Sequence, residues 1–119
     1  MIHFRSILSI ALLLLTSGCS LLSPSFDYEE AVFSDEVEPL QGQLFLPRNI
    51  EQPVAAVVVV HGGGWVRRSG DMVSISKQLA RQGIAAFNIT YRSAMYHPYP
   101  AAVSDVRQAL SLIHISEPT

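Results

Sequence analysis

The sequence is poor in the residues that mark several common classes of protein. It contains one cysteine among 119 residues, Cys19, which excludes an intrachain disulfide. The four histidines are scattered, and no cysteine or histidine pair has the spacing of a zinc site. Eight Lys and Arg against ten Asp and Glu give a net charge of −2, which provides no electrostatic basis for binding nucleic acid. Composition therefore gives no reason to expect a metal, an organic cofactor or a nucleic-acid partner.

Glycine patterns that bind nucleotides, or that present a catalytic serine, are missing as well. Neither G-x-G-x-x-G nor G-x-x-x-x-G-K-[ST] occurs. The pattern G-x-S-x-G, which places a nucleophilic serine at a strand-to-helix turn, is also absent. No pair of glycines brackets a serine at that spacing, since they stand at positions 18, 42, 62, 63, 64, 70 and 83.

Residues 1–18 have the features of a secretory signal. Arg5 precedes an apolar run, Ile7 to Leu15, which is too short to span about 30 Å of hydrocarbon. The small residues that follow lead directly to Cys19 and resemble a bacterial lipobox. That resemblance implies cleavage before Cys19, a lipid on this cysteine and a tether over residues 19–26.

A lipid-anchored protein of this kind is expected in the bacterial cell envelope. Ser20, next to the cysteine, favours the outer membrane, with the folded domain facing the periplasm. The alternative is an ordinary secretory signal in which the cysteine falls by chance.

The remaining chain predicts one partial α/β domain over residues 27–110. Two antiparallel strands are expected first, followed by a parallel β-α-β-α unit joined by a right-handed crossover. The expected strands cover residues 28–33, 41–46, 54–60 and 84–90. One helix is expected from about residue 72 to a glycine cap at Gly83, and a second from Pro100.

Several side chains carry local expectations. The stretch from Asp27 to Glu38 holds six of the ten carboxylates, which we interpret as a charged edge strand rather than a metal or acid–base site. Ser69 or Asp71 is expected to cap the first helix. Further expectations are core packing for Met72 and Ile75, a solvated loop for Arg67 and Arg68, and exposed positions for Asp105 and Arg107.

Residues 57–65, Val-Val-Val-Val-His-Gly-Gly-Gly-Trp, are the most informative stretch. Four β-branched residues predict a strand buried on both faces. Three glycines at its end supply no packing, so they indicate a sharp bend that lets another molecule approach the backbone. Amides in such a bend can hold developing negative charge, as in an oxyanion hole. A tight structural turn is the alternative interpretation.

Two stretches together resemble esterases and lipases of the α/β-hydrolase superfamily. His61 to Trp65 is similar to the HGGG motif, and residues 91–110, YRSAMYHPYPAAVSDVRQAL, resemble the YRLAPEHPYPAAL-x-D run of hormone-sensitive-lipase-like and BD-FAE-like carboxylesterases. The sequence departs from that run at Ser93 and at residues 95–96, where Leu and Pro-Glu are usual.

The resemblance implies a serine esterase that acts on small carboxylic esters. The amides of Gly63 and Gly64 would form the oxyanion hole, with Gly62 and His61 supporting the loop. Arg92 and Asp105 would pair structurally.

The resemblance also limits which residues take part in the chemistry. His97 is not expected to be the base, because in this fold the catalytic histidine follows the nucleophile in sequence. These 119 residues contain no candidate nucleophile or acid–base partner, so the chain is expected to be an inactive fragment that stops before the nucleophile turn.

Two further expectations concern what the chain is. Residues 111–119, SLIHISEPT, resemble a translated sequencing adaptor, so this tail is interpreted as foreign. A non-catalytic envelope lipoprotein that binds partners, and an amide hydrolase of the formamidase or peptidase type, remain alternatives to the esterase.

Overall fold

The computed structural model describes residues 25–34 and 38–115. The predicted signal and Cys19 lie outside the described residues. Among the described residues, no helix is long and apolar enough to cross a membrane. The elements are β1 (Phe26–Ser34), β2 (Leu40–Pro47), β3 (Ala56–Val60), α2 (Met72–Arg81), β4 (Ala85–Ile89) and α3 (Ala101–Ile115).

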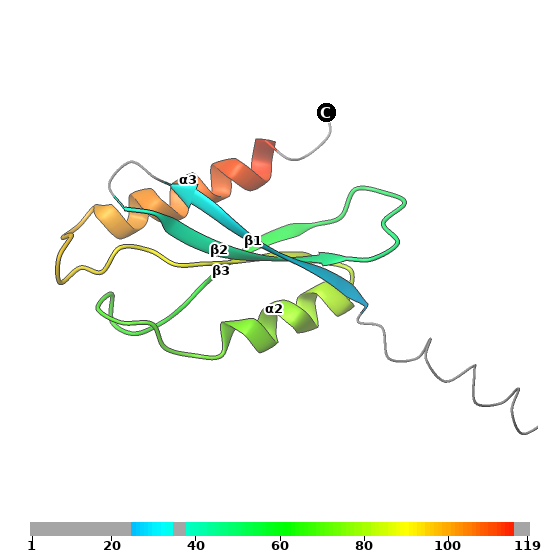
Figure 1. Cartoon of the computed structure of the whole chain (residues 1–119), viewed down its shortest axis with the longest axis horizontal. Coiled ribbons are helices and arrows are strands. Elements are labelled where there is room, and N and C mark those ends of the chain that lie inside the picture. The colour runs from blue at the N-terminus through cyan, green and yellow to red at the C-terminus, as the bar shows by residue number, and fades with distance from the viewer. Residues whose placement is uncertain (1–24, 35–37, 116–119) are drawn as a thin grey trace, which may run out of the picture.

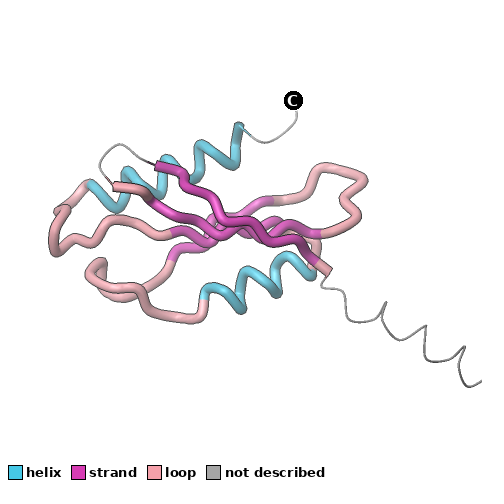
Figure 2. The backbone as a smooth tube through the Cα atoms, viewed as in Figure 1, coloured by secondary structure: helices cyan, strands magenta, loops and turns pink. Residues whose placement is uncertain are grey.

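The four strands form one mixed sheet in the order β1-β2-β4-β3 (Figure 1). β1 pairs with β2 and β2 with β4, both antiparallel, whereas β3 and β4 are parallel and are joined by α2. This is the predicted arrangement, and the strand bounds agree with the sequence-based ranges to within two residues. Because β3 and β4 run in parallel, the segments that follow them leave the sheet at the same end (Figure 2).

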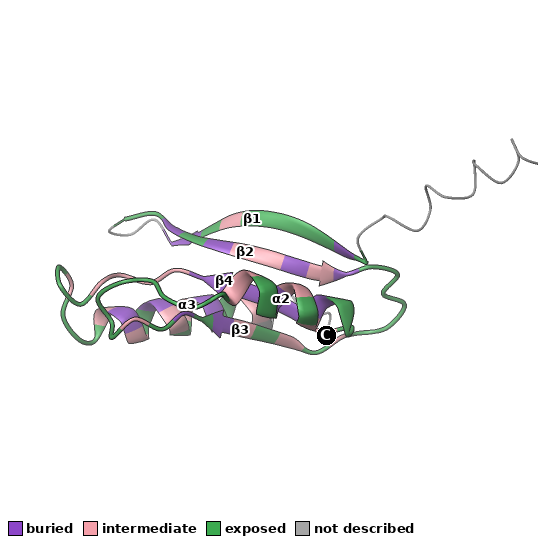
Figure 3. Ribbon diagram, turned by 90° about the horizontal axis from the view of Figure 1, so that it is seen from below, coloured by how far each residue is buried: buried purple, intermediate pink, exposed green. Residues whose placement is uncertain are grey.

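The two helices cover opposite faces of the sheet (Figure 1). On the α2 side, Phe45, Val59 and Ala86 form a core against Ala80 of the helix. On the other side, Phe87 and the residues around it pack against α3. Alternate residues of β4 therefore enter two separate cores, which is why all five of its residues are buried (Figure 3).

The prediction that β3 is buried on both faces is wrong. Val57 is 36% exposed and Val60 is 39% exposed, and β3 lies at the edge of the sheet, paired only with β4 among the described strands. β4, which lies between β2 and β3, is the fully buried strand instead. A run of β-branched residues shows that a strand is apolar, but it does not show how many neighbours the strand has.

The ends of α2 confirm both predicted caps. Asp71 is the N-cap, and its carboxylate accepts a hydrogen bond of 3.0 Å from the Ser74 amide. Hydrogen bonds from Ser74 lower the pKa of Asp71. Gly83 follows the helix with φ of 86°, a conformation that favours glycine. Inside the helix Met72 packs on the core as expected, but Ile75 is 44% exposed, so its predicted core position is wrong.

Candidate functional site

The turn after β3 has three consecutive residues with positive φ. The φ values are 120° at Gly63, 63° at Gly64 and 68° at Trp65. A Cβ atom built on Gly63 would lie 1.7 Å from the backbone oxygen of Arg67, so only glycine fits there. Gly64 has open space around it and is favoured by its φ value alone. Trp65 adopts a left-handed backbone conformation that is costly for a bulky residue, and such strained residues are often found at functional sites.

Hydrogen bonds within this loop leave two glycine amides without a partner. The backbones of Gly62 and Ser69 exchange two bonds, of 3.1 and 3.0 Å. The Gly63 carbonyl accepts the amides of Val66 and Arg67. By contrast, the N–H groups of Gly63 and Gly64 donate to no group in the described part of the chain.

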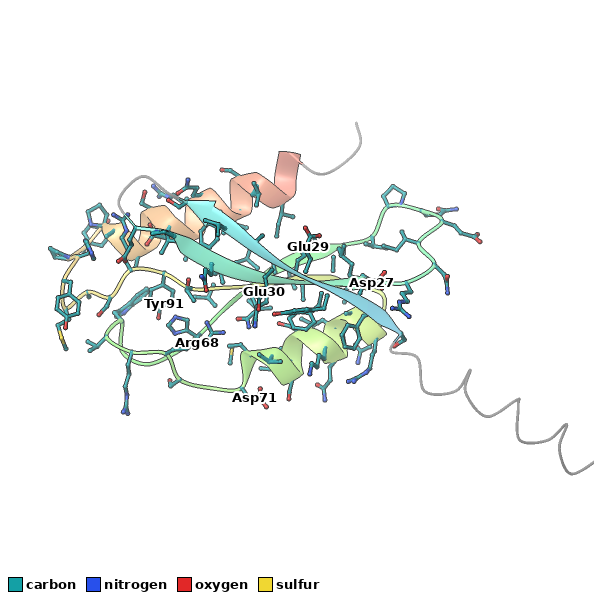
Figure 4. All side chains as sticks on the ribbon, in the orientation of Figure 1. Asp27, Glu29, Glu30, Arg68, Asp71 and Tyr91 are labelled. Atoms are coloured by element: carbon teal, nitrogen blue, oxygen red, sulfur yellow. The ribbon has the colours of Figure 1, made fainter. Side chains whose placement is uncertain are left out.

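His61 and Tyr91 form the base of the loop. Their rings stack with centroids 4.1 Å apart and planes 6° apart, and the Tyr91 hydroxyl donates to the His61 carbonyl at 3.0 Å. The His61 ring is buried, with Nδ1 2.8 Å from the Gly62 carbonyl. Burial raises the pKa of Tyr91, whose ring lies at the sheet end from which the loop leaves (Figure 4). His61 therefore packs under the loop, which suits a supporting role.

The segment after β4, residues 91–100, holds the outer part of the loop after β3, residues 61–70, which we call the glycine loop. The Ala94 amide donates to the Trp65 carbonyl at 2.8 Å, and the Ser93 hydroxyl donates to the Val66 carbonyl at 2.9 Å. Residues that are almost thirty positions apart are thereby joined directly. The loop is fastened to the neighbouring strand end as well as to its own strand.

Arg92 and Asp105 pair as the resemblance implied. The shortest contact, between Nη2 and Oδ1, is 2.7 Å, and Asp105 also accepts the Arg92 amide at 2.9 Å. The prediction that Asp105 is exposed is wrong, because only 2% of it is accessible. Its neighbour Arg107 is exposed, as expected. The buried ion pair fixes the start of the segment after β4 against α3.

The family of the chain follows from a comparison with known proteins. A family model described as BD-FAE matches residues 43–116, which is more than half of the sequence. The chain belongs to the BD-FAE family. No curated protein matches the sequence.

Solved structures show the same fold and extend well beyond this chain. A bacterial heroin esterase is 26% identical with a TM-score of 0.66 over 90% of this chain and 35% of that protein. An esterase from Pyrobaculum calidifontis is 27% identical with a TM-score of 0.67, over 94% and 36%. The brefeldin A esterase, a bacterial homologue of human hormone sensitive lipase, is 23% identical with a TM-score of 0.60, over 74% and 26%.

These neighbours are esterases of the hormone-sensitive-lipase-like α/β-hydrolase family, and the fold of this BD-FAE chain is a part of theirs. The chain spans about a third of the length of the first two structures. The two stretches that resemble this family in sequence, His61 to Trp65 and residues 91–110, begin in the glycine loop and in the segment after β4.

A pocket of about 250 Å³ opens beside Gly64 of this BD-FAE chain. Gly64 and Trp65 form one side, and Ala94, His97 and Tyr99 come from the segment after β4. Its remaining lining is mostly apolar. The Nε2 atom of His97 lies 3.9 Å from Oε1 of Glu38, and within the described residues no serine or threonine hydroxyl hydrogen-bonds to the His97 ring.

Sequence reasoning missed a polar network that also reaches the glycine loop. Arg68 donates to the Asn88 side chain at 3.0 Å, and Asn88 donates to Gln43 at 3.0 Å. Asn88 is 1% exposed although it lies in an otherwise apolar strand. Asn88 was the available signal, because a buried amide side chain requires hydrogen-bond partners. In the described part of the chain, no three acidic, cysteine or histidine side chains cluster as a metal site.

Proposed function

We propose that this chain provides the oxyanion-binding part of a serine esterase. The observation that carries the proposal is the pair of Gly63 and Gly64 amides, which have positive-φ backbones and donate to no group in the described residues. An unbonded backbone N–H beside a pocket is free to donate to a ligand oxygen. Family membership adds that related proteins are esterases.

The proposed chemistry is acyl transfer to serine. A serine outside these 119 residues attacks the ester carbonyl while a histidine takes its proton, and the carbonyl oxygen becomes an oxyanion. Gly63 and Gly64 donate to that oxyanion, together with the amide that follows the serine. One such donor contributes about 2.7–4 kcal/mol to transition-state stabilisation. Collapse of the intermediate expels the alcohol, and water then releases the acid.

The location of the loop agrees with the proposed anchoring through Cys19. β1 begins beside Pro47, at the sheet end opposite to the carboxyl ends of β3 and β4 (Figure 1). A lipid upstream of β1 would thus hold the domain at the end remote from the glycine loop. We propose that the protein is held on the periplasmic side of the outer membrane and that its site opens away from the lipid, toward small soluble esters.

The proposal is tested by extending the genomic reading frame past Leu110 and assaying the longer product with p-nitrophenyl acetate. We expect a G-x-S-x-G pattern in the extension and measurable turnover, whereas the 119-residue chain gives none. In the longer product, Gly63→Ala keeps its amide, but its Cβ collides with the Arg67 backbone and displaces the turn. We expect kcat to fall by about 10²–10³-fold, as when one oxyanion donor is lost.

Gly83→Ala is the control for the backbone conformation, because Gly83 also has positive φ, but it has open space around it and lies at the end of α2. Turnover by the 119-residue chain above its Gly63→Ala variant would contradict the proposal, as would an extension without a nucleophile. Hydrolysis of a p-nitroanilide in preference to the ester would identify an amide hydrolase instead.

A further inference from the structure

Ser93 occupies a position where the related esterase run has Leu, and its hydroxyl both donates and accepts a hydrogen bond. Oγ donates to the Val66 carbonyl at 2.9 Å and accepts the Met95 amide at 3.2 Å. The first bond joins the segment after β4 to the glycine loop, and the second holds the segment's own turn. A leucine side chain can make neither bond.

The bond to Val66 acts on the part of the loop that contains the unbonded amides. The Val66 amide donates to the Gly63 carbonyl at 3.2 Å, so the peptide groups of Gly63 and Val66 are linked through the turn. Within the described residues, Ser93 is the only residue whose side chain hydrogen-bonds any of residues 63–66. Its neighbour Ala94 contributes a backbone bond to Trp65 beside it.

We propose that Ser93 is a positioning residue that fixes the orientation of the Gly63–Trp65 backbone. Three successive residues with positive φ have few bonds of their own, so their orientation depends on outside attachments. Ser93 supplies one from the segment after β4, where the preceding residue, Arg92, is held by its bonds to the buried Asp105. The catalytic meaning of this role rests on the proposed esterase function, but the structural coupling does not.

Trp65 reports on this coupling without any need for turnover. It is the only tryptophan in the sequence, it stands next to Val66, and it is 53% exposed. Its fluorescence anisotropy and its quenching by acrylamide therefore measure the order and accessibility of the loop at Trp65, where the ring also contacts Tyr91. Far-UV circular dichroism measures the rest of the fold independently.

The experiment compares the full 119-residue chain with Ser93→Val and Ser93→Thr, which have nearly the same shape and differ by one hydroxyl. Ser93→Val is expected to lower the anisotropy of Trp65 and to raise its quenching constant, with the far-UV spectrum retained. Ser93→Thr is expected to restore both values. Ser104→Ala, at an exposed position of α3 whose side chain makes no hydrogen bond in the described residues, is the control and should change neither.

The proposal is overturned if Ser93→Val and Ser93→Thr give the same Trp65 anisotropy and quenching constant, or if Ser93→Val gives the same values as Ser104→Ala. It is also overturned if Trp65 of the unmodified chain is quenched as freely as N-acetyltryptophanamide, because the loop would then be unheld. If Ser93→Val loses its far-UV spectrum, Ser93→Ala takes its place against Ser93→Thr with the same two outcomes. Absence of esterase activity in the longer gene product would leave all of these results unchanged, so the two proposals fail separately.

Discussion

The segments that follow β3 and β4 leave the sheet at the same end and contact each other, but they are built differently. Residues 61–70 use backbone groups, because positive-φ residues bend the chain and the amides of Gly63 and Gly64 donate to no group among the described residues. Residues 91–100 use side chains, and Tyr91, Arg92 and Ser93 each hold a neighbouring element. The first segment presents the chemical groups and the second fixes them. Substitutions in the first segment should therefore lower stability by forcing side chains into a backbone that has no room for them. Substitutions in the second segment should lower it by removing hydrogen bonds and ion pairs.

The largest expected effect is on the second segment. Asp105→Ala removes the carboxylate that compensates Arg92 in a mostly buried pair, so we expect a loss of about 3–5 kcal/mol in the free energy of unfolding. Urea denaturation followed by circular dichroism measures the loss. Arg107→Ala, on the exposed side of the same helix, should change stability little. Equal losses for the two variants would show that the pair does not hold this segment.

The next largest effect on stability is expected from substitutions at the two glycines of the first segment. Gly63→Ala places a Cβ against the Arg67 backbone, whereas Gly64→Ala meets open space. Gly64→Ala is expected to cost only the penalty of left-handed backbone, about 1–2 kcal/mol, and Gly63→Ala clearly more. Thermal unfolding of the two variants side by side makes the measurement. A Gly63→Ala variant as stable as Gly64→Ala would mean that the turn is not closed as described.

Tyr91 joins the two segments, and its removal should have a smaller effect. Tyr91→Phe loses the hydrogen bond to the His61 carbonyl but keeps the stacked ring, so we expect a loss of about 0.5–1.5 kcal/mol. Unfolding in urea at neutral pH measures this loss. A variant as stable as the unmodified chain would show that the hydroxyl bond is not needed to hold the base of the loop.

Stability should also depend on pH through Tyr91. Because burial raises its folded-state pKa above the ordinary value of 10.0, the folded state favours the neutral phenol. This contribution is complete below pH 10 and is lost as pH rises through the folded pKa. Tyr28→Phe should serve as the background, because its hydrogen bond to Glu30 raises the pKa of Tyr28 in the same direction. In that background, Tyr91→Phe should flatten the alkaline decline in stability; an unchanged decline would assign it to other groups.

The smallest effect is at the boundary between the first segment and α2. Asp71→Ala removes the helix cap, and we expect the Tm at neutral pH to fall by a few degrees, while Asp71→Ser restores most of it. Hydrogen bonds from Ser74 lower the pKa of Asp71, so this contribution is present above pH 3.8 and disappears as pH falls through the folded pKa. A Tm difference that persists below that range would contradict the charged cap.

Local signals predicted most of the fold and less of the site. Alternating and β-branched runs, Asp71 before α2 and Gly83 after it each act within a few residues, and they predicted the order and type of the elements. The edge position of β3 and the burial of Asp105 depend on which distant elements pack there. A single sequence contains no direct signal for either feature.

Contacts around the glycine loop were also not predictable where they join distant residues. The glycines themselves indicated a turn with free amides, because their effect is local. The bonds from Ser93 and Arg68 join residues far apart in sequence, and neither residue type is unusual in a loop. Only Asn88, a polar residue in an apolar strand, offered a hint that a partner was required.

The proposed function depends on whether the Gly63 and Gly64 amides are free to donate, and residue-resolved hydrogen exchange of the ¹⁵N-labelled chain tests this most directly. We predict slow exchange for the Gly62 and Ser69 amides, which bond to each other's carbonyls, and rates close to those of an open peptide for Gly63 and Gly64. Gly63 and Gly64 amides as protected as that of Gly62 would mean that they are already bonded within the protein. In that case they would not be available to an ester oxyanion.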